Sequence, residues 1–162
     1  MSKIRNTTAM LVLGIAGALS ANANAQDYSN VSNGVSCQPS STAGMVYTVT
    51  QIRNESSNNR TAYCVVGLDD SSSVEYSLFQ IVLRNTGDVP RNVTCTAKVG
   101  QPFVGYVTVS ETVEVPAGGA PVINTMTNIE RNTQYAVMGF NCVLPPKVAL
   151  DLFGAWETPP AP

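Results

Sequence analysis

Apolar and polar residues alternate along most of the chain beyond residue 44, which is the pattern of β-strands with one buried face. The alternation is clearest over residues 92–99, where the apolar positions and the intervening Thr94, Thr96 and Lys98 would point to opposite sides. No stretch beyond the first 25 residues has the apolar spacing of an amphipathic helix. The sequence therefore predicts an all-β protein.

Turn-rich segments separate the alternating stretches and define about eight strands, a number typical of a two-sheet antiparallel β-sandwich. A small barrel is the alternative. Residues 74–84 are apolar on both faces near their end and are expected to form a central strand, whereas residues 26–44 are polar and predict an irregular lead-in. The expected strands cover residues 45–53, 61–67, 74–84, 92–99, 103–115, 121–126, 134–143 and 148–153. The expected core draws on Val82, Leu83, Val93, Val107, Val109, Val137, Phe140, Val148 and Leu150.

The first 25 residues have the pattern of a secretory signal peptide. Lys3 and Arg5 precede an apolar run over residues 9–19, and Ala23-Asn24-Ala25 supplies a small-x-small cleavage site. The run is shorter than the roughly 20 residues of a membrane span, although an uncleaved anchor is the alternative. We expect export to the periplasm or the extracellular space, a single domain over residues 26–157 and a Pro-rich tail over residues 158–162.

Charge and composition narrow the classes of partner. The chain has 162 residues, nine basic against eleven acidic residues and no histidine. Loss of the signal peptide would leave seven basic residues and a net charge of −4. Scattered cations argue against nucleic-acid binding and against attraction to an anionic membrane, and no second apolar run could span a bilayer.

The four cysteines suit an oxidising compartment. Without histidine, a zinc site would need four isolated thiolates, so two disulfides are expected instead. Three pairings are possible. Cys95 and Cys142 lie within expected strands and could link them through the sandwich core, and Cys37 could then tie the lead-in to Cys64. We expect these sequential pairs.

Four short motifs carry a resemblance: residues 34–40 (GVSCQPS), residues 62–66 (AYCVV), residues 93–96 (VTCT) and a closing Tyr135 with residues 142–146 (CVLPP). Together they resemble a group of small, uncharacterised exported proteins of Gram-negative bacteria. The resemblance spans most of the chain beyond residue 25 and implies export, a β-sandwich and two paired cysteines. It implies no activity. Val65-Val66 stands where such proteins would have a proline after the second cysteine.

The sequence offers little for catalysis. Nucleophile-elbow, P-loop and dinucleotide-binding motifs are missing, and no histidine could activate a nucleophile. Asp69 and Asp70 share a turn with the nearby Glu75, and Glu111 and Glu114 would point to opposite faces of one strand. We therefore expect no enzyme, no catalytic residue and no cofactor.

Two ligand sites are possible. Asp69, Asp70 and Glu75 could wrap a calcium ion, but the segment lacks the spaced acids and glycine of known loops, so a solvated turn is the alternative. Tyr106 is the best candidate for an exposed ligand-binding aromatic, because Thr108 and Ser110 share its face. The alternative is that Tyr106 is a half-buried strand residue without a ligand.

Export, paired cysteines and missing catalytic groups predict a non-enzymatic binding or structural protein, with a protein or glycan partner. The first alternative is a subunit of a polymeric surface fibre or pilus, in which residues 26–44 would be an exchanged arm. That segment lacks the alternating apolar residues of a donor strand. A less favoured alternative is an inhibitor of an exported enzyme that presents the loop over residues 54–60.

Overall fold

The computed structural model describes residues 30–66, 75–101, 105–130 and 137–157. The predicted signal peptide, the Asp69-Asp70 turn and the Pro-rich tail lie outside these residues. The described chain consists of strands and one short 3-10 turn, η1. The elements are β1 (Asn30–Asn33), η1 (Gly34–Ser36), β2 (Gln38–Pro39), β3 (Met45–Tyr47), β4 (Ile52–Asn54), β5 (Arg60–Val66), β6 (Glu75–Asn85), β7 (Arg91–Gln101), β8 (Gly105–Val115), β9 (Val122–Glu130), β10 (Val137–Leu144) and β11 (Val148–Glu157).

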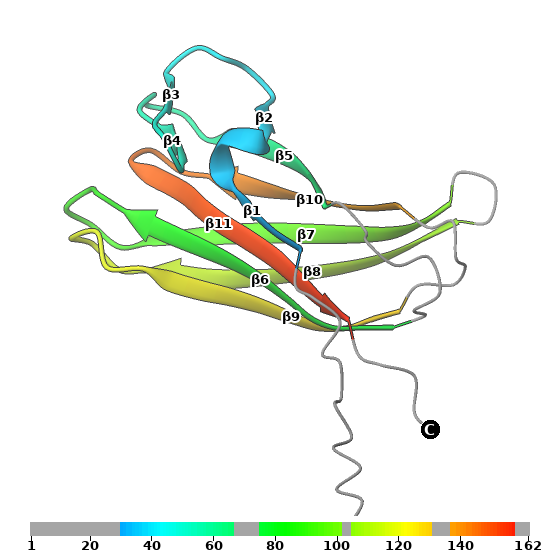
Figure 1. The fold of residues 1–162 in the computed structure, drawn as a ribbon. Coiled ribbons are helices and arrows are strands. Elements are labelled where there is room, and N and C mark those ends of the chain that lie inside the picture. Colours follow the sequence, from blue (N-terminus) through cyan, green and yellow to red (C-terminus); the bar gives the residue numbers. More distant parts are fainter. Residues whose placement is uncertain (1–29, 67–74, 102–104, 131–136, 158–162) are drawn as a thin grey trace, which may run out of the picture.

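The strands form two sheets that stack as a sandwich, and all their pairs are antiparallel (Figure 1). Sheet A has the order β3-β4-β11-β6-β9, with β1 also paired to β11. Sheet B has the order β2-β5-β10-β7-β8. The predicted all-β sandwich is confirmed, and β6, between β11 and β9, is the central strand that the sequence indicated.

The core lies between the sheets, where apolar side chains from alternate positions meet. Phe140 on β10 contacts Phe79 on β6 and Phe153 on β11, with ring centroids 5.0 and 4.8 Å apart and the rings edge to face. These three rings tie sheet B to both central strands of sheet A. Each such aromatic pair adds about 1 kcal/mol beyond the burial of its area.

Most of the core predicted from the sequence is buried. Leu83, Val93, Phe140, Val148 and Leu150 are buried, Val107 and Val109 are partly buried, and the side chain of Val137 lies outside the described residues. Val82 was assigned wrongly. Ile81 and Leu83 occupy the core-facing positions of β6, so the alternation of the strand turns Val82 toward the outer face of sheet A.

The strand predicted over residues 45–53 is wrong, because the chain reverses there. Residues 45–47 and 52–54 form a hairpin, closed where the amide of Thr48 donates to the carbonyl of Gln51 at 3.0 Å. Met45 is therefore buried while Val49, at the tip, is 89% exposed. The turn contains neither glycine nor proline, which explains why the alternating pattern ran through it.

The lead-in is more ordered than predicted. Residues 30–33 pair with residues 152–155 of β11. They lie along the same edge of β11 that pairs with β4 farther along the strand. Residues 38–39 pair with β5. Backbone hydrogen bonds hold these short, polar strands, so their side chains needed no apolar alternation. With them, the described residues contain eleven strands instead of about eight.

Candidate functional site

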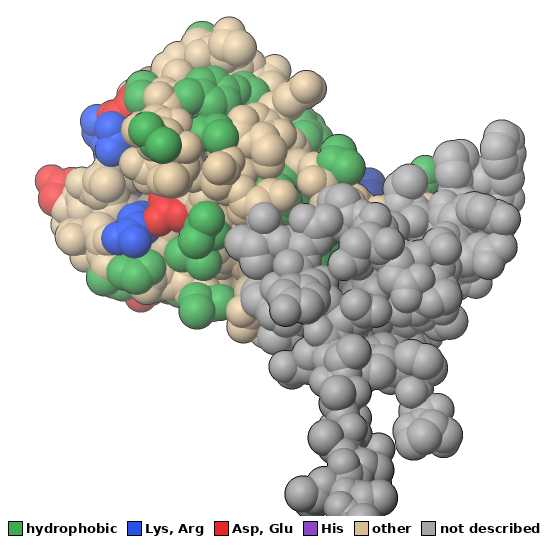
Figure 2. All heavy atoms as spheres, viewed as in Figure 1, with side chains coloured by type: hydrophobic (Ala, Val, Ile, Leu, Met, Phe, Trp, Pro, Cys, Tyr) green, Lys and Arg blue, Asp and Glu red, His purple; other side chains and the backbone are tan. Residues whose placement is uncertain are grey.

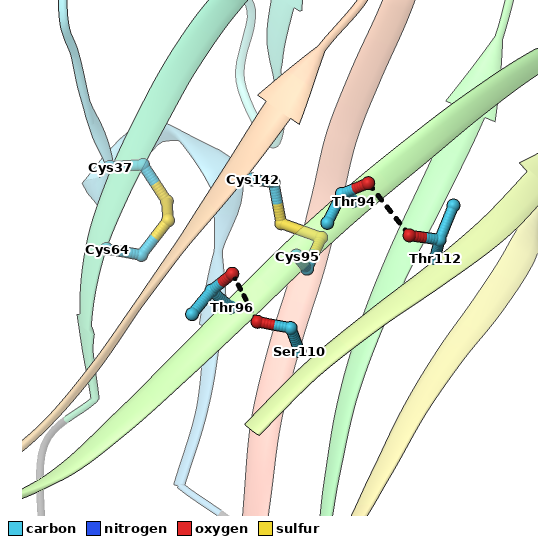
Figure 3. The surroundings of a disulfide bond; sticks show 8 residues. All are labelled: Cys37, Cys64, Thr94, Cys95, Thr96, Ser110, Thr112 and Cys142. Atoms are coloured by element: carbon cyan, nitrogen blue, oxygen red, sulfur yellow. Dashed lines mark hydrogen bonds between the residues drawn. A yellow bond between two sulfur atoms is a disulfide. The ribbon is translucent and has the colours of Figure 1, made fainter. Parts of the chain in front are cut away.

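The buried cysteines indicate which residues of sheet B face outward. Cys37 is bonded to Cys64 and Cys95 to Cys142, as the sequence predicted (Figure 3). All four are buried. Because neighbouring strand residues point to opposite faces, the residues beside Cys64, Cys95 and Cys142 form the outer face of sheet B.

The expectation that Cys95 and Cys142 link the two sheets is wrong. They are directly opposed on neighbouring strands β7 and β10 of the same sheet, with Cα atoms 4.1 Å apart. A disulfide usually joins Cα atoms no more than about 7 Å apart. A closely opposed pair within one antiparallel sheet is within that span.

The register of sheet B aligns the outward residues in rows across the strands. One row runs through Gln38, Tyr63, Asn141, Thr96 and Ser110. The next row runs through Val65, Gly139, Lys98 and Thr108. Tyr106 stands beyond this second row, opposite Gly100. The outer face combines the two tyrosines and the exposed Val65 with mainly uncharged polar residues, and its charged positions among the described residues are Lys98 and the distant Glu114.

Hydroxyl pairs hold the β7 and β8 side chains of this face in place (Figure 3). Thr94 and Thr112 are hydrogen-bonded at 2.8 Å, and so are Thr96 and Ser110. Both pairs are cross-strand neighbours, the arrangement in which strand side chains stabilise each other.

A groove of about 770 Å³ runs over this face. Tyr63 on β5 and Tyr106 on β8 line it, and they are 52% and 51% exposed. They lie three strands and four residue positions apart in the register, a diagonal of roughly 20 Å. We call this the tyrosine groove. Its lining residues are Ser36, Gln38, Tyr63, Cys64, Val65, Thr96, Lys98, Tyr106, Met138, Gly139, Phe140 and Asn141.

Gly139 forms part of the floor of the tyrosine groove. Its pairing with Val65 and Lys98 is regular on both sides, so no bulge requires a glycine there, and its φ is not positive. A glycine inside a central strand costs about 0.5–1 kcal/mol relative to alanine and can mark a place where a ligand comes close to the backbone. Among the described residues other than its chain neighbours, only the carbonyl oxygen of Cys64, at 3.2 Å, lies within 4 Å of the position that a Cβ atom would take.

A second hollow, of about 690 Å³, is lined by residues of the loops that connect the two sheets. These loops lie at one end of the sandwich (Figure 1). Glu55 pairs there with both Arg53 and Lys147. The hydrogen bond from Lys147 lowers the pKa of Glu55, and the charge of Arg53 acts in the same direction. Glu55 thus partly neutralises the two cations. Figure 2 shows two blue groups on the left of the view, each beside a red group.

The other residues that the sequence singled out are scattered. Tyr106 lies in the tyrosine groove, whereas Asp69 and Asp70 lie outside the described residues, and so does the side chain of Glu75. Glu111 and Glu114 are both exposed on β8, opposite Cys95 and Asn92. The described residues contain no group of three His, Cys, Asp or Glu side chains that could hold a metal ion. Within the same residues, no helix is long and apolar enough to cross a membrane.

The sequence analysis missed Tyr63, Lys98, Gly139 and Asn141 as parts of one site. Two signals were present: an aromatic residue between the buried positions of residues 61–67, and a glycine inside the strand predicted over residues 134–143. Only the pairing of β5, β10 and β7 brings them together.

No protein-family model matches the sequence, and no curated protein matches it significantly. Among solved structures, the fold is similar to part of the GH26-CBM35 β-(1,4)-mannanase of Podospora anserina, with a TM-score of 0.54 and 11% identity. The match covers 84% of this chain and 29% of the mannanase chain. Looser matches include a CBM4 structure (TM-score 0.37, 12% identity, 85% of this chain and 99% of the other) and TmCBM61 in complex with β-1,4-galactotriose (0.38, 12%, 82% and 86%). These likenesses concern the fold alone.

Proposed function

We propose that the protein is an exported, non-catalytic carbohydrate-binding domain that holds a glycan chain in the tyrosine groove. The observation that carries this proposal is the open floor at Gly139, in a regular central strand, between two half-exposed tyrosines. Two exposed aromatic rings, with one position between them that has no side chain, suit an extended, flat ligand.

The chemistry of the lining fits a sugar chain. Tyrosine rings offer flat apolar faces to the C–H faces of pyranose rings, and their hydroxyl groups add a polar edge. Asn141, Gln38 and Thr96 add amide and hydroxyl groups that can both donate to and accept from sugar hydroxyls. The diagonal of roughly 20 Å between the tyrosines exceeds one sugar ring, so an oligosaccharide is the favoured ligand.

Composition and covalent structure support a binding role outside the cytoplasm. The sequence has no histidine, and among the described residues no aspartate or glutamate lines the groove as an acid–base pair would. Two buried disulfides are typical of oxidising compartments. The signal-peptide pattern of residues 1–25 agrees with export.

The two alternatives remain predictions. For the fibre subunit, residues 30–33 of the supposed arm pair with β11 of the same chain. For the inhibitor alternative, the side chain of Asn54, at the end of β4, donates to the carbonyl oxygen of Asn58. This hydrogen bond ties the loop over residues 54–60 to the end of its own strand. The native mass of the protein would test the first alternative, because a fibre subunit should form a high-mass species.

The proposal is tested with a glycan array, followed by calorimetry on the polysaccharides that bind. Tyr63→Ala and Tyr106→Ala should each weaken binding by about tenfold or more, as loss of an anchoring aromatic does. Tyr47→Ala is the matched control, because Tyr47 is 45% exposed on β3 and does not line the groove. Failure to bind any glycan, or equal binding by both groove variants and the wild type, would refute the proposal.

A further inference from the structure

We infer that the tyrosine groove selects glycan chains that carry anionic groups, and that Lys98 recognises those groups. This inference rests on the proposed function and names the class of ligand. The shared chemistry is a carboxylate or sulfate ester on a sugar ring.

Lys98 is placed to meet a ligand lying in the groove. It is exposed on the outer face of β7, opposite Gly139 on one side and Thr108 on the other. Because Gly139 has no side chain, no β10 side chain separates Lys98 from the groove floor in this row. A chain lying over Gly139 would therefore pass beside the ammonium group, and the Thr108 hydroxyl offers a second donor.

Lys98 also gives the groove its charge. Among the described residues that line the groove, it is the one formally charged side chain. In the described part of the chain, the positions flanking it in the next row are Asn141, Thr96 and Ser110, none of them a carboxylate. The ion pairs of the described residues involve other cations, namely Arg53, Arg84 and Lys147.

The net charge of the chain makes this position informative. Eleven acidic residues outnumber nine basic ones, so the protein as a whole does not attract polyanions. A preference for anionic glycans would have to arise locally, and Lys98 is the charge in the groove that could produce it. A lysine provides up to three donors to one anionic group.

The experiment compares neutral glycans with their anionic counterparts. The probes are soluble β-1,4-glucan and its C6-carboxylated form, β-1,4-mannan and polymannuronate, and dextran and dextran sulfate. For at least one pair, the wild-type protein at low salt should bind the anionic form about tenfold more tightly, as expected of one charge-assisted hydrogen bond. The first two pairs report on carboxylates and the third on sulfate. The preference should shrink as salt is raised.

Variants assign the preference to Lys98. Lys98→Gln should remove the preference for the anionic form, while Lys98→Arg should keep it. Lys147→Gln is the control, because Lys147 is exposed outside the groove. Equal affinity for both members of every pair, or a preference that survives Lys98→Gln, would overturn the inference and leave the proposed function standing. Absence of binding to every probe and to the glycan array would overturn the proposed function, and this inference with it.

Discussion

Asn54 and Asn85 perform the same task at two places in the sandwich. Each is completely buried at the end of a sheet A strand, where the chain crosses to sheet B. The Asn54 amide donates to the carbonyls of Asn58 at 2.8 Å and Leu144 at 2.7 Å. The Asn85 amide donates to those of Val89 at 2.7 Å and Val115 at 3.2 Å. Each side chain thus fastens its own turn to the end of a second strand of sheet B.

The sequence around these two asparagines repeats. Arg53-Asn54 and Arg60 precede Cys64. Arg84-Asn85 and Arg91 precede Cys95 at the same spacing. In both copies a short loop leads from sheet A into a strand of sheet B whose cysteine is disulfide-bonded. The repeat was visible in the sequence, but its meaning depends on where each amide points.

We expect Asn54→Ala and Asn85→Ala each to lower the free energy of unfolding by about 2–3 kcal/mol, because each removes two hydrogen bonds, one of them to the buried carbonyl of Leu144 or Val115. Urea unfolding with the disulfides intact measures the change. Asn59→Ala is the control, because Asn59 is exposed in the same loop as Asn54. A loss below about 0.5 kcal/mol, the usual size of a surface substitution, would contradict the buried role.

A second prediction concerns the floor of the tyrosine groove. Gly139→Val should weaken glycan binding by more than about tenfold, because its side chain would fill the floor between the two tyrosines. The fold should persist, since valine suits a central strand and the Cys64 carbonyl needs to shift by only a few tenths of an ångström. Calorimetry measures binding, and near-ultraviolet circular dichroism checks the fold. Unchanged affinity in a folded Gly139→Val protein would show that the glycan does not bind over Gly139.

The sequence predicted the fold better than the site. Alternation in residues 92–99 assigned the faces of β7 correctly, because the side-chain period of a strand is local. It failed at the β3–β4 hairpin, where the turn is made by Thr48 and Gln51 without a glycine or proline. Tyr106 could be identified in the sequence because the neighbouring residues on its face are polar. Its relation to Gly139 and Tyr63 could not, because it depends on the register of four strands far apart in the sequence.

The two disulfides should differ in what they contribute. Replacing both members of a pair by alanine should cost about 3.5 kcal/mol for Cys37–Cys64 and about 4 kcal/mol for Cys95–Cys142, because the second closes a longer loop in the unfolded chain. All four cysteines are buried, so both double variants also leave a cavity. Guanidinium unfolding of the two double variants gives the order, and a greater loss for Cys37–Cys64 would contradict it.

The Glu55 pair with Lys147 should contribute to stability above the acid range. Its pKa is held below the usual 4.5, mainly by the hydrogen bond from Lys147, so the folded state favours the charged carboxylate. This contribution is therefore present above pH 4.5 and is lost as the pH falls through the lowered pKa. Glu55→Gln should cost no more than about 1 kcal/mol at pH 7, as partly exposed ion pairs do, and flatten the acid side of the stability profile. Urea unfolding between pH 2 and 7 measures both, with Glu114→Gln, exposed on β8, as the control. An acid profile that Glu55→Gln leaves unchanged would show that the pair contributes nothing.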